Sequence, residues 1–600
     1  MGNVSRRVCI GNAQGFWGDR TDAACEMLAL EPALDFLTLD FLAEVSMSIL
    51  SLQRARDPEA GWPRDFLDVV RSIASYWRSG GRCRVITNAG GLSPLGCARA
   101  CLDVLLSSGC GGRTIAVVSG DEVLSLIRAG NVADELLQNL DTGQPIAEVR
   151  DRLATANAYL GAQPIAAALD RGADLVITGR VADPSLTVAA CAHWFGWQWN
   201  DWNRLAGATV AGHLIECGTQ LTGGIATDWL DMPDVDRLGF PIAEVSADGG
   251  CVVTKPRQSG GRICQRTVKE QLLYEIGDPD AYLSPDVTVS LLSLRLDDDG
   301  AGRVRVAGAQ GRPAPPTYKV SATYQDGFWA EGHLTVFGAE SVAKARRAGQ
   351  AVMSQLKRSG ISLGESLVEC LGAGACRPQG IEPTLARQLT ETVLRIAVAD
   401  ESREAVERFA RALMPLVTAG PPGTTGYAEG RPRVHPLFRF WPCLIERKQV
   451  MPQIEVFRTS DQVAGEEPAE WTRPPLFVSA QEQPPVNCGE PSPDSPRRLG
   501  DIAYARSGDK GINANIGLIA RHPEAFPRLL REATSQRVAS YFDISDARRV
   551  ARYELPNLGA MNFVIRGILA SPLRVDVQGK ALAQVLLEMP LEDTEQRKSL

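Results

Sequence analysis

The first 190 residues alternate short apolar strands with helical stretches, and this alternation limits the fold more than any other feature. One expected strand ends at Ile10, and the others cover 36–39, 85–87, 115–118 and 175–178. Strands that alternate with helices form βαβ units, which place the strands in parallel in one sheet. We therefore predict an α/β fold, in which a large body with a mainly parallel sheet and flanking helices precedes a small C-terminal α+β domain.

Composition divides the chain into three parts. Residues 1–458 form the expected α/β body, with a possible sub-boundary near 235–250. Residues 459–498 are the expected linker, because eight prolines fall between Pro468 and Pro496 and proline-rich polar stretches stay extended. Residues 499–600 are expected to form the small domain, whose strands are LGDIAYA, ANIGLIA, MNFVIRGIL and LRVDV. Within the body, TVLRIAVAD predicts a strand and SREAVERFARALMPL a helix.

Charge and cysteine spacing exclude several classes of protein. The net charge is −8 and no basic block occurs, so no nucleic-acid partner is expected. No apolar run approaches the roughly 18 residues of a membrane span. The fourteen cysteines are irregularly spaced without C-x-x-C, a pattern typical of reduced thiols in the cytoplasm. We expect a cytoplasmic homo-oligomer that does not contact a membrane.

Each expected strand is followed by a loop rich in glycine or charged residues. In chain order these loops are GNAQGFWGDR, DFLAE, NAGGLSP, SGDEV and GRVADPS. Ligands of parallel sheets bind outside the carboxyl ends of the strands, and all five loops would lie at that edge. Five polar loops at one edge predict a binding site.

The first loop carries Gly11, Gly15 and Gly18, a spacing that matches neither the dinucleotide fingerprint nor a phosphate-binding loop. One interpretation is an anion site, in which backbone N–H groups at Gly15 and Gly18 approach the ligand and Arg20 clamps it. The other is a turn in which Asp19 caps the following helix. We favour the anion site, with Asp19 as a candidate for proton transfer.

Asp40 and Glu44 follow the second expected strand and lie one turn apart if a helix begins near residue 41. The pair could hold a divalent cation, or one carboxylate could act as a general base. Alternatively, one caps the helix and the other is a surface acid.

The third and fifth loops supply further candidates. Asn88, Gly90 and Gly91 offer an amide and a flexible backbone for substrate binding. Arg180 and Asp183 place a cation and an acid on the fifth loop. We expect Arg180 to bind an anionic substrate and Asp183 to transfer protons.

His213, Glu216 and Cys217 are spaced i, i+3 and i+4 on one expected helix. The trio could activate the Cys217 thiol or contribute to a metal site. The alternative is a structural histidine without a role in catalysis.

The stretch ARSGDKGINAN of the small domain holds two cations, Arg506 and Lys510, in a glycine-framed loop. It could reach over the site of the body and bind an anionic group. The alternative is a hairpin turn with Asn and Asp in turn positions.

Several blocks in order resemble the acyclic terpene utilisation (AtuA) family. They are IGNAQGFWGDR, LDFLAEVSMSILSLQRARDP, VITNAGGLSP, ITGRVADPS, AGHLIECGTQLTGG and TVKEQLLYEIGDP. ARSGDKGINANIGLIAR resembles the small C-terminal domain of that family, which is ferredoxin-like. The resemblance implies a role near acyl-CoA carboxylases and hydratases, and hence a carboxylate or acyl-CoA substrate.

These observations lead to two hypotheses. The first is an enzyme with lyase or hydratase chemistry through an enolate-like intermediate. No NAD, FAD or biotin signature is present, and CoA enters only as part of a substrate. The second is a non-catalytic binding or scaffold subunit that partners an acyl-CoA enzyme. The sequence defines no metal site.

Overall fold

The computed structural model describes residues 7–377, 380, 382–427, 430–458 and 496–592. Its largest sheet has ten strands in the order β11-β12-β8-β7-β1-β2-β3-β6-β4-β19. The central five run parallel, and Ile10 pairs with Phe36 at the start of that register. They are β1 (Arg7–Asn12), β2 (Phe36–Leu39), β3 (Arg84–Thr87), β4 (Thr114–Ser119) and β6 (Leu175–Thr178). These are the five strands that the alternating pattern predicted.

Antiparallel strands extend this sheet on both sides, so the expectation of a mainly parallel sheet is wrong for its outer half. They are β7 (Ile242–Ser246), β8 (Cys251–Thr254), β12 (Val304–Ala307), β11 (Arg295–Asp298) and β19 (Gln453–Arg458). A short turn joins β7 to β8, and strands joined by such a turn are antiparallel. The possible sub-boundary near 235–250 falls at β7. Because β7 pairs with β1, the segments before and after that point belong to the same sheet.

Helices cover both faces of the parallel strands. Alternate strand residues pack on opposite faces: Leu37 and Val85 against one set of helices, Phe36 and Ile86 against the other. The first set is α1 (Ala23–Leu30), α3 (Phe66–Arg78) and α4 (Pro94–Ser107). The second is α6 (Gln163–Asp170), α7 (Ser185–Phe195) and α8 (Trp202–Ile215). Strands buried on both faces are typical of doubly wound sheets.

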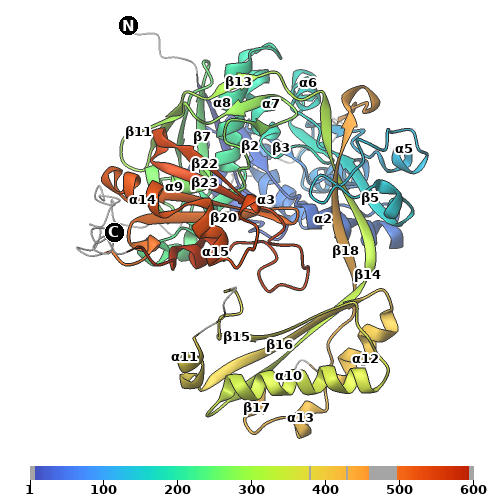
Figure 1. Cartoon of the computed structure of the whole chain (residues 1–600). Helices are drawn as coiled ribbons and strands as arrows, with labels where there is room; N and C mark the ends of the chain where they lie inside the picture. The colour runs from blue at the N-terminus through green and yellow to red at the C-terminus, as the bar shows by residue number, and fades with distance from the viewer. Residues whose placement is uncertain (1–6, 378–379, 381, 428–429, 459–495, 593–600) are drawn as a thin grey trace.

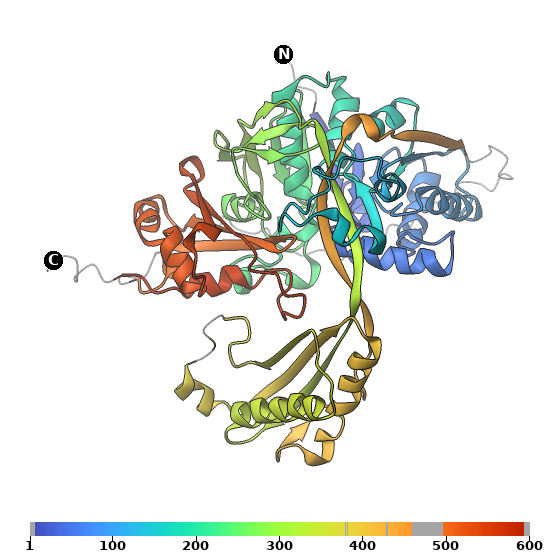
Figure 2. The ribbon, with the colours of Figure 1, turned by 45° about the vertical axis from the view of Figure 1, so that its right-hand side comes forward.

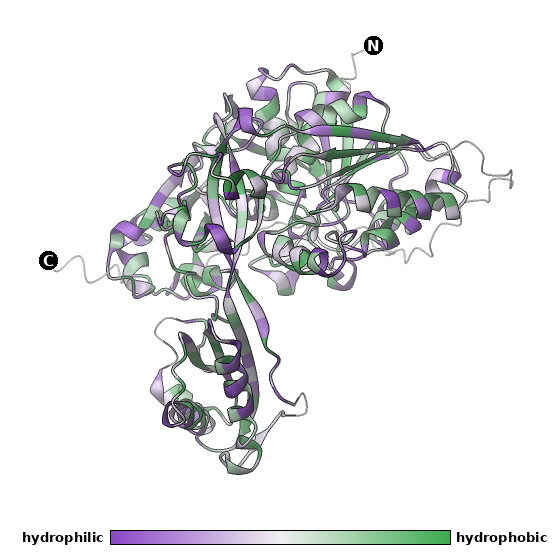
Figure 3. Cartoon of the chain, turned by 90° about the vertical axis from the view of Figure 1, so that its right-hand side faces the viewer, coloured by the Kyte–Doolittle hydropathy of each residue, from purple (hydrophilic) through white to green (hydrophobic). Residues whose placement is uncertain are grey.

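Smaller elements complete the body around the carboxyl ends of the parallel strands. The helices are α2 (Glu44–Arg56), α5 (Leu124–Arg128) and α9 (Gln265–Leu272). A three-stranded antiparallel sheet contains β9 (Tyr282–Leu283), β10 (Thr288–Ser290) and β13 (Gln310–Arg312). In Figure 3 the strands inside the body are largely hydrophobic, whereas hydrophilic residues gather on turns and outer helix surfaces. In the described part of the chain, no helix has the length and apolar character needed to cross a membrane.

A separate lobe, residues 328–435, extends below the body (Figure 1). The 21-residue strand β14 (Thr317–Phe337) and its partner β18 (His435–Glu446) connect it to the body, where β5 (Leu153–Ala158) also pairs with β14. The other lobe elements are β15 (Glu365–Leu371), β16 (Glu391–Asp400), β17 (Thr424–Thr425), α10 (Ser341–Arg358), α11 (Pro383–Gln388), α12 (Arg403–Leu413) and α13 (Leu416–Ala419). The predicted strand and helix of residues 384–415 are confirmed as β16 and α12.

The tail domain, residues 498–592, lies against the body beside α9 (Figures 1 and 2). Its antiparallel sheet has the order β20-β21-β23-β22, which confirms a small α+β domain. Its elements are β20 (Ala503–Lys510), β21 (Asn513–Ala520), β22 (Val550–Leu555), β23 (Ala560–Ile565), α14 (Phe526–Glu532), α15 (Ser535–Tyr541) and α16 (Leu582–Leu587). Most of the expected linker, residues 459–495, lies outside the described residues.

The expected strand LRVDV is wrong, because residues 573–577 form turns. Leu573 is buried against Ala397 and Ala399 of the lobe, whereas Val575 and Val577 are exposed. The apolar alternation therefore does not bury one face of a strand in a sheet.

Candidate functional site

Charged side chains from the strand-end loops and from the tail domain converge beside the carboxyl edge of the parallel sheet. Their mutual electrostatic influence links residues of the body with Lys510 of the tail domain. We call this set the acid–base cluster; it consists of Asp40, Arg180, Asp183, Glu216, Glu275 and Lys510.

Arg180 is the central cation on the body side of the cluster. Its Nη1 donates to Asp183 Oδ1 at 2.8 Å and to the Leu42 carbonyl at 3.0 Å, and its side chain is only 3% exposed. The guanidinium carbon lies 4.3 Å from the centre of the Tyr159 ring. Burial alone would lower the pKa of Arg180, but Asp183, Tyr159 and Asp40 hold it above its ordinary value. Arg180 therefore stays charged.

Asp40 is a buried carboxyl group that favours its neutral form. Its Oδ1 accepts hydrogen bonds from Asn88 Nδ2 at 2.6 Å and from the Leu42 N–H at 3.2 Å. Burial and the charge of Asp183 raise the pKa of Asp40 well above its usual range, and Arg180 and Asn88 offset this only in part. Asn88 thus positions Asp40. The raised pKa of Asp40 favours the protonated form more than in an exposed aspartate.

The hydrogen bonds of His213 show that Glu216 is also a neutral acid. His213 Nε2 lies 3.1 Å from the Gln271 carbonyl, which only accepts, so Nε2 carries the proton. Burial lowers the pKa of His213 to about 4, which leaves Nδ1 as an acceptor at pH 7. Nδ1 lies 3.3 Å from Glu216 Oε1, a contact that requires a proton on Glu216. Burial and Asp183 raise the pKa of Glu216 well above its usual range.

The first glycine loop holds the chain segment that carries Glu216. Asn12 Nδ2 donates to the carbonyl oxygens of Ile215 at 2.6 Å and Glu216 at 3.0 Å. A Cβ at Gly15 would lie 2.8 Å from the Cys217 carbonyl carbon, so only glycine permits this approach. The loop therefore fixes the end of α8 at the carboxyl edge of the sheet.

Lys510 brings a second cation to the cluster from the end of β20. Its Nζ lies 2.7 Å from Glu275 Oε2, and its side chain is 53% exposed. Burial opposes its charge, but Glu275, Tyr282 and Glu44 raise the pKa of Lys510 well above its ordinary value. Glu275 has a φ of 57°, and non-glycine residues with such strained backbone cluster at functional sites. Solvent therefore reaches a charged pair that the fold holds in a strained geometry.

Hydrogen bonds dock the β20–β21 hairpin onto the body. Asn515 Nδ2 donates to the Leu273 carbonyl at 2.7 Å, and its Oδ1 accepts from the Glu275 N–H at 2.9 Å. A Cβ at Gly508 would lie 2.6 Å from Glu275 Cγ. At the hairpin tip, Asn513 Nδ2 donates to Asp141 Oδ1 at 2.7 Å. The hairpin therefore reaches the edge of the body where the strand-end loops lie.

The stability of the protein is expected to fall as the pH rises from 5 to 8. Burial, with the charges of Glu275 and Glu44, raises the pKa of Asp509 from 3.8 to about 7. Between these two pKa values the native protein keeps a proton that the unfolded chain has released, so a rising pH favours unfolding until the pH passes about 7. The Asp509→Asn variant cannot titrate at this position, so its free energy of unfolding should decrease by on the order of 1 kcal/mol less over the same pH range. The effect is no larger because the carboxyl group is partly exposed. Melting temperatures of both proteins at pH 5 to 8 measure the effect, and equal slopes would contradict it.

The structure does not bring three candidates of the first loop to the cluster. Arg20 pairs with Asp22 at 3.0 Å and with Glu26 at 2.7 Å on the surface, so it is not an anion clamp. Asp19 accepts hydrogen bonds from the N–H groups of Gly15 and Arg20. Gly18 lies in the same turn, closed by a hydrogen bond from the Asp19 N–H to the Phe16 carbonyl. This loop turns the chain and packs against α8.

Four other candidates have structural positions or lie at the rim of the cluster. Arg506 is buried between body and tail, where it pairs with Glu270 at 3.5 Å. Glu44 begins α2 and lies 3.5 Å from Lys319. Gly90 and Gly91 form the turn that a hydrogen bond to the Asn88 carbonyl closes.

The surroundings of Cys217 favour the thiol over an activated thiolate. Burial raises the pKa of the Cys217 thiol well above its usual value, and the Glu216 and Glu275 carboxyl groups add to the effect. The expected catalytic role for this residue is therefore disfavoured by its surroundings.

Sequence reasoning missed Glu275 and Tyr282 and treated Glu216 only as a partner of Cys217. Tyr282 comes from β9, and its ring centre lies 5.6 Å from that of His213. Glu275 follows α9 within TVKEQLLYEIGDP, one of the blocks of the resemblance, which was the available signal. In the described ranges, no group of three or more His, Cys, Asp or Glu side chains is placed to hold a metal ion.

Comparison with known proteins identifies the family. The model described as "Acyclic terpene utilisation family protein AtuA" matches residues 8–456, and the model "AtuA ferredoxin-like domain" matches residues 497–592. No curated protein and no solved structure matches the chain. The two family models together cover the body, the lobe and the tail domain, and the chain belongs to the AtuA family.

Proposed function

We propose that this protein is an enzyme that acts on a small carboxylate or its CoA thioester, with lyase or hydratase chemistry through an enolate-like intermediate. The observation that carries the proposal is the buried Glu216 carboxyl group, which lies 3.3 Å from His213 Nδ1 and within the electrostatic influence of two cations, Arg180 and Lys510. Within the described residues, Glu216 Oε2 is buried without a hydrogen-bond partner. A carboxyl group whose pKa is raised by burial in a charged, partly solvated site is typical of general acid catalysis.

The proposed reaction divides acid and base roles between two carboxyl groups. The Asp183 carboxylate takes the proton from the carbon next to the substrate carbonyl, and the electron pair moves to the carbonyl oxygen. The charges of Arg180 and Lys510 stabilise the resulting enolate. Glu216 then donates its proton to the hydroxyl group on the neighbouring carbon, the electron pair of the enolate returns to form the C=C bond, the C–O bond breaks, and water leaves. Addition of water follows the reverse path, and solvent returns the proton from Asp183 to Glu216.

A non-catalytic subunit that partners an acyl-CoA enzyme is the second candidate. Exposed apolar side chains favour it: Leu230 is 91% exposed, and Ile225 and Trp229 are exposed nearby. Such side chains together favour a protein interface. We also propose that the protein is a cytoplasmic homo-oligomer whose subunits contact each other through this surface.

Ligand-induced stabilisation tests the enzyme proposal. A panel of small carboxylates and their CoA thioesters is expected to contain members that raise the melting temperature, since a ligand at 100 times its Kd adds about 2.7 kcal/mol. Lys510→Met should weaken that binding about tenfold or more, because the exposed ammonium attracts the anion. Arg20→Ala is the matched control and should bind normally. No shift with any member, or equal losses in both variants, would exclude the proposed site.

A further inference from the structure

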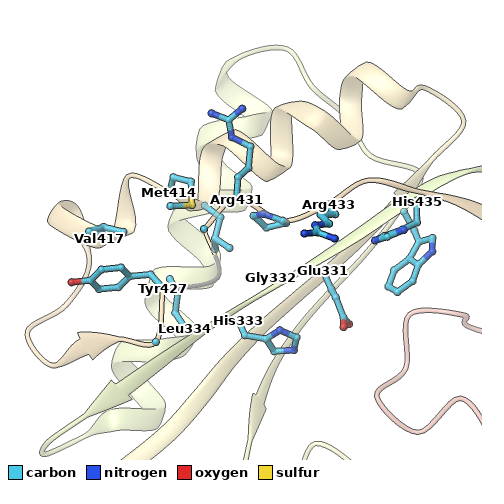
Figure 4. A pocket seen from close by; sticks show the side chains of 15 residues that line it. Glu331, Gly332, His333, Leu334, Met414, Val417, Tyr427, Arg431, Arg433 and His435 are labelled. Carbon is cyan, nitrogen blue, oxygen red and sulfur yellow. The ribbon is translucent and has the colours of Figure 1, made fainter.

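The lobe contains a cavity of about 450 Å³ that none of the roles above uses (Figure 4). It lies where β14 meets the chain between α13 and β18. The residues that matter for its chemistry are Trp329, His333, Tyr427, Arg431, Arg433 and His435. Its volume lies within the range of small-molecule sites.

A gap in the β-ladder opens this cavity. The β18 ladder ends at the pair Trp329–His435, and the β17 ladder begins at the pair Thr335–Thr425. In the part of the lobe that the structure describes, this edge of β14 has no strand partner between these two pairs. A loop carrying Arg431 and Arg433 crosses the gap instead (Figure 4).

The described lining of the cavity carries more positive than negative charge, with Arg431 and Arg433 against the single acid Glu331. Arg431 and Arg433 are exposed, and neither forms an ion pair with any residue that the structure describes. Glu331 is the acid of the lining, but its carboxylate lies 2.6 Å from Arg395. His333 and His435 add two nitrogen-bearing rings. Such a lining attracts an anion, and arginine favours phosphate through paired hydrogen bonds.

Aromatic rings lie beside these cations. The ring centres of Trp329 and His435 are 5.9 Å apart with a 40° tilt, and Tyr427 is 43% exposed. Figure 4 places His435 and Tyr427 at opposite ends of the lining. Planar rings at such positions bind the face of an aromatic ligand.

The cavity is separate from the acid–base cluster. Lys319, which pairs with Glu44 at the rim of the cluster, and His333 lie on the same strand. They are fourteen positions apart, which corresponds to roughly 45 Å of extended strand. A ligand that fills a cavity of this size cannot also reach the cluster.

We infer that the lobe cavity binds a nucleotide-class ligand, an aromatic base joined to phosphate. The two arginines hold the phosphate, and the aromatic side chains contact the base. A free nucleotide and the nucleotide end of CoA share this chemistry. The site stands apart from the proposed function, because none of its residues belongs to the acid–base cluster.

Calorimetric titration of the full-length protein tests the inference, with ADP, CoA, orthophosphate and adenosine as probes. ADP or CoA should bind at least tenfold more tightly than orthophosphate or adenosine. Tighter binding of ADP would indicate a free nucleotide as the ligand, and tighter binding of CoA would indicate the nucleotide end of CoA. Arg431→Ala/Arg433→Ala should weaken that binding at least tenfold, since both side chains are exposed and their loss leaves the fold intact. Arg403→Ala is the matched control, because Arg403 is an exposed lobe arginine paired with Glu407 at 3.0 Å.

Three outcomes would overturn the inference. The first is that neither ADP nor CoA binds the wild-type protein at millimolar concentration. The second is that orthophosphate binds as tightly as the nucleotides, because the aromatic base would then contribute nothing to binding. The third is that Lys510→Met weakens nucleotide binding while the double arginine variant does not, because the nucleotide would then bind at the acid–base cluster. This third result would leave the proposed function intact.

Discussion

Replacing Glu216 by glutamine is expected to lower the turnover of the substrate at least a hundredfold while the protein stays folded. Glutamine keeps the size of the side chain but cannot release a proton, and a positioned general acid contributes about 10²–10⁴-fold to the rate. Turnover of the ligand that stabilises the wild-type protein, followed by mass spectrometry, measures the loss. Melting temperature reports whether the fold is retained.

The pH profile separates an acid role for Glu216 from a structural role. In the wild-type protein the rate should fall at high pH, as Glu216 loses the proton that its raised pKa retains. In the glutamine variant the residual rate should lack this fall. If the variant keeps both the wild-type rate and the wild-type profile, Glu216 is not the acid.

Replacing Arg180 by methionine is expected to destabilise the protein by about 3 kcal/mol, because removing one partner of a buried charge pair leaves the other uncompensated. Met fills much of the space of the Arg stem, so the loss reports mainly on charge. The Asp183 side chain would lose its partner at 2.8 Å, and Asp40 would lose a neighbouring positive charge. The thermal unfolding midpoint should fall by several degrees.

Arg20→Met is the control for this stability measurement. Arg20 also forms ion pairs, with Asp22 and Glu26, but its side chain is 42% exposed. Surface ion pairs contribute about 0–1 kcal/mol, so its midpoint should change little. If the thermal unfolding midpoints of the two variants fall equally, the Arg180 ion pair contributes no more to stability than an exposed ion pair does.

The sequence predicted the parallel centre of the body well, because each strand is a short apolar run followed by a polar loop. Buried strands such as β2 and β6 need apolar residues on both faces, and this requirement is visible locally. The lobe was not predicted as a separate unit. Its core depends on β14, whose two halves pair with different strands, and pairing between distant segments leaves no local pattern.

The same distinction applies to the acid–base cluster. Arg180, Asp183 and Asp40 could be proposed because they follow strands whose ends share one edge. Lys510 could be proposed because its loop combined charge with glycine. Glu275 could not be proposed from local pattern, because it reaches the cluster only through the docking of Asn515 and Gly508 of the tail domain. Arg20 is not brought to the cluster, because Asp22 and Glu26, at the start of the helix that follows it, form ion pairs with it.

The protonation of Glu216 tests the central claim most directly, because it requires no substrate. Infrared difference spectra of the wild-type protein and Glu216→Gln at pH 7 compare their carbonyl stretching bands. The hydrogen bonds of His213 and the raised pKa of Glu216 predict a protonated carboxylic acid band in the wild-type protein that the variant lacks. A spectrum in which the substitution removes only a carboxylate band would contradict the proposed acid.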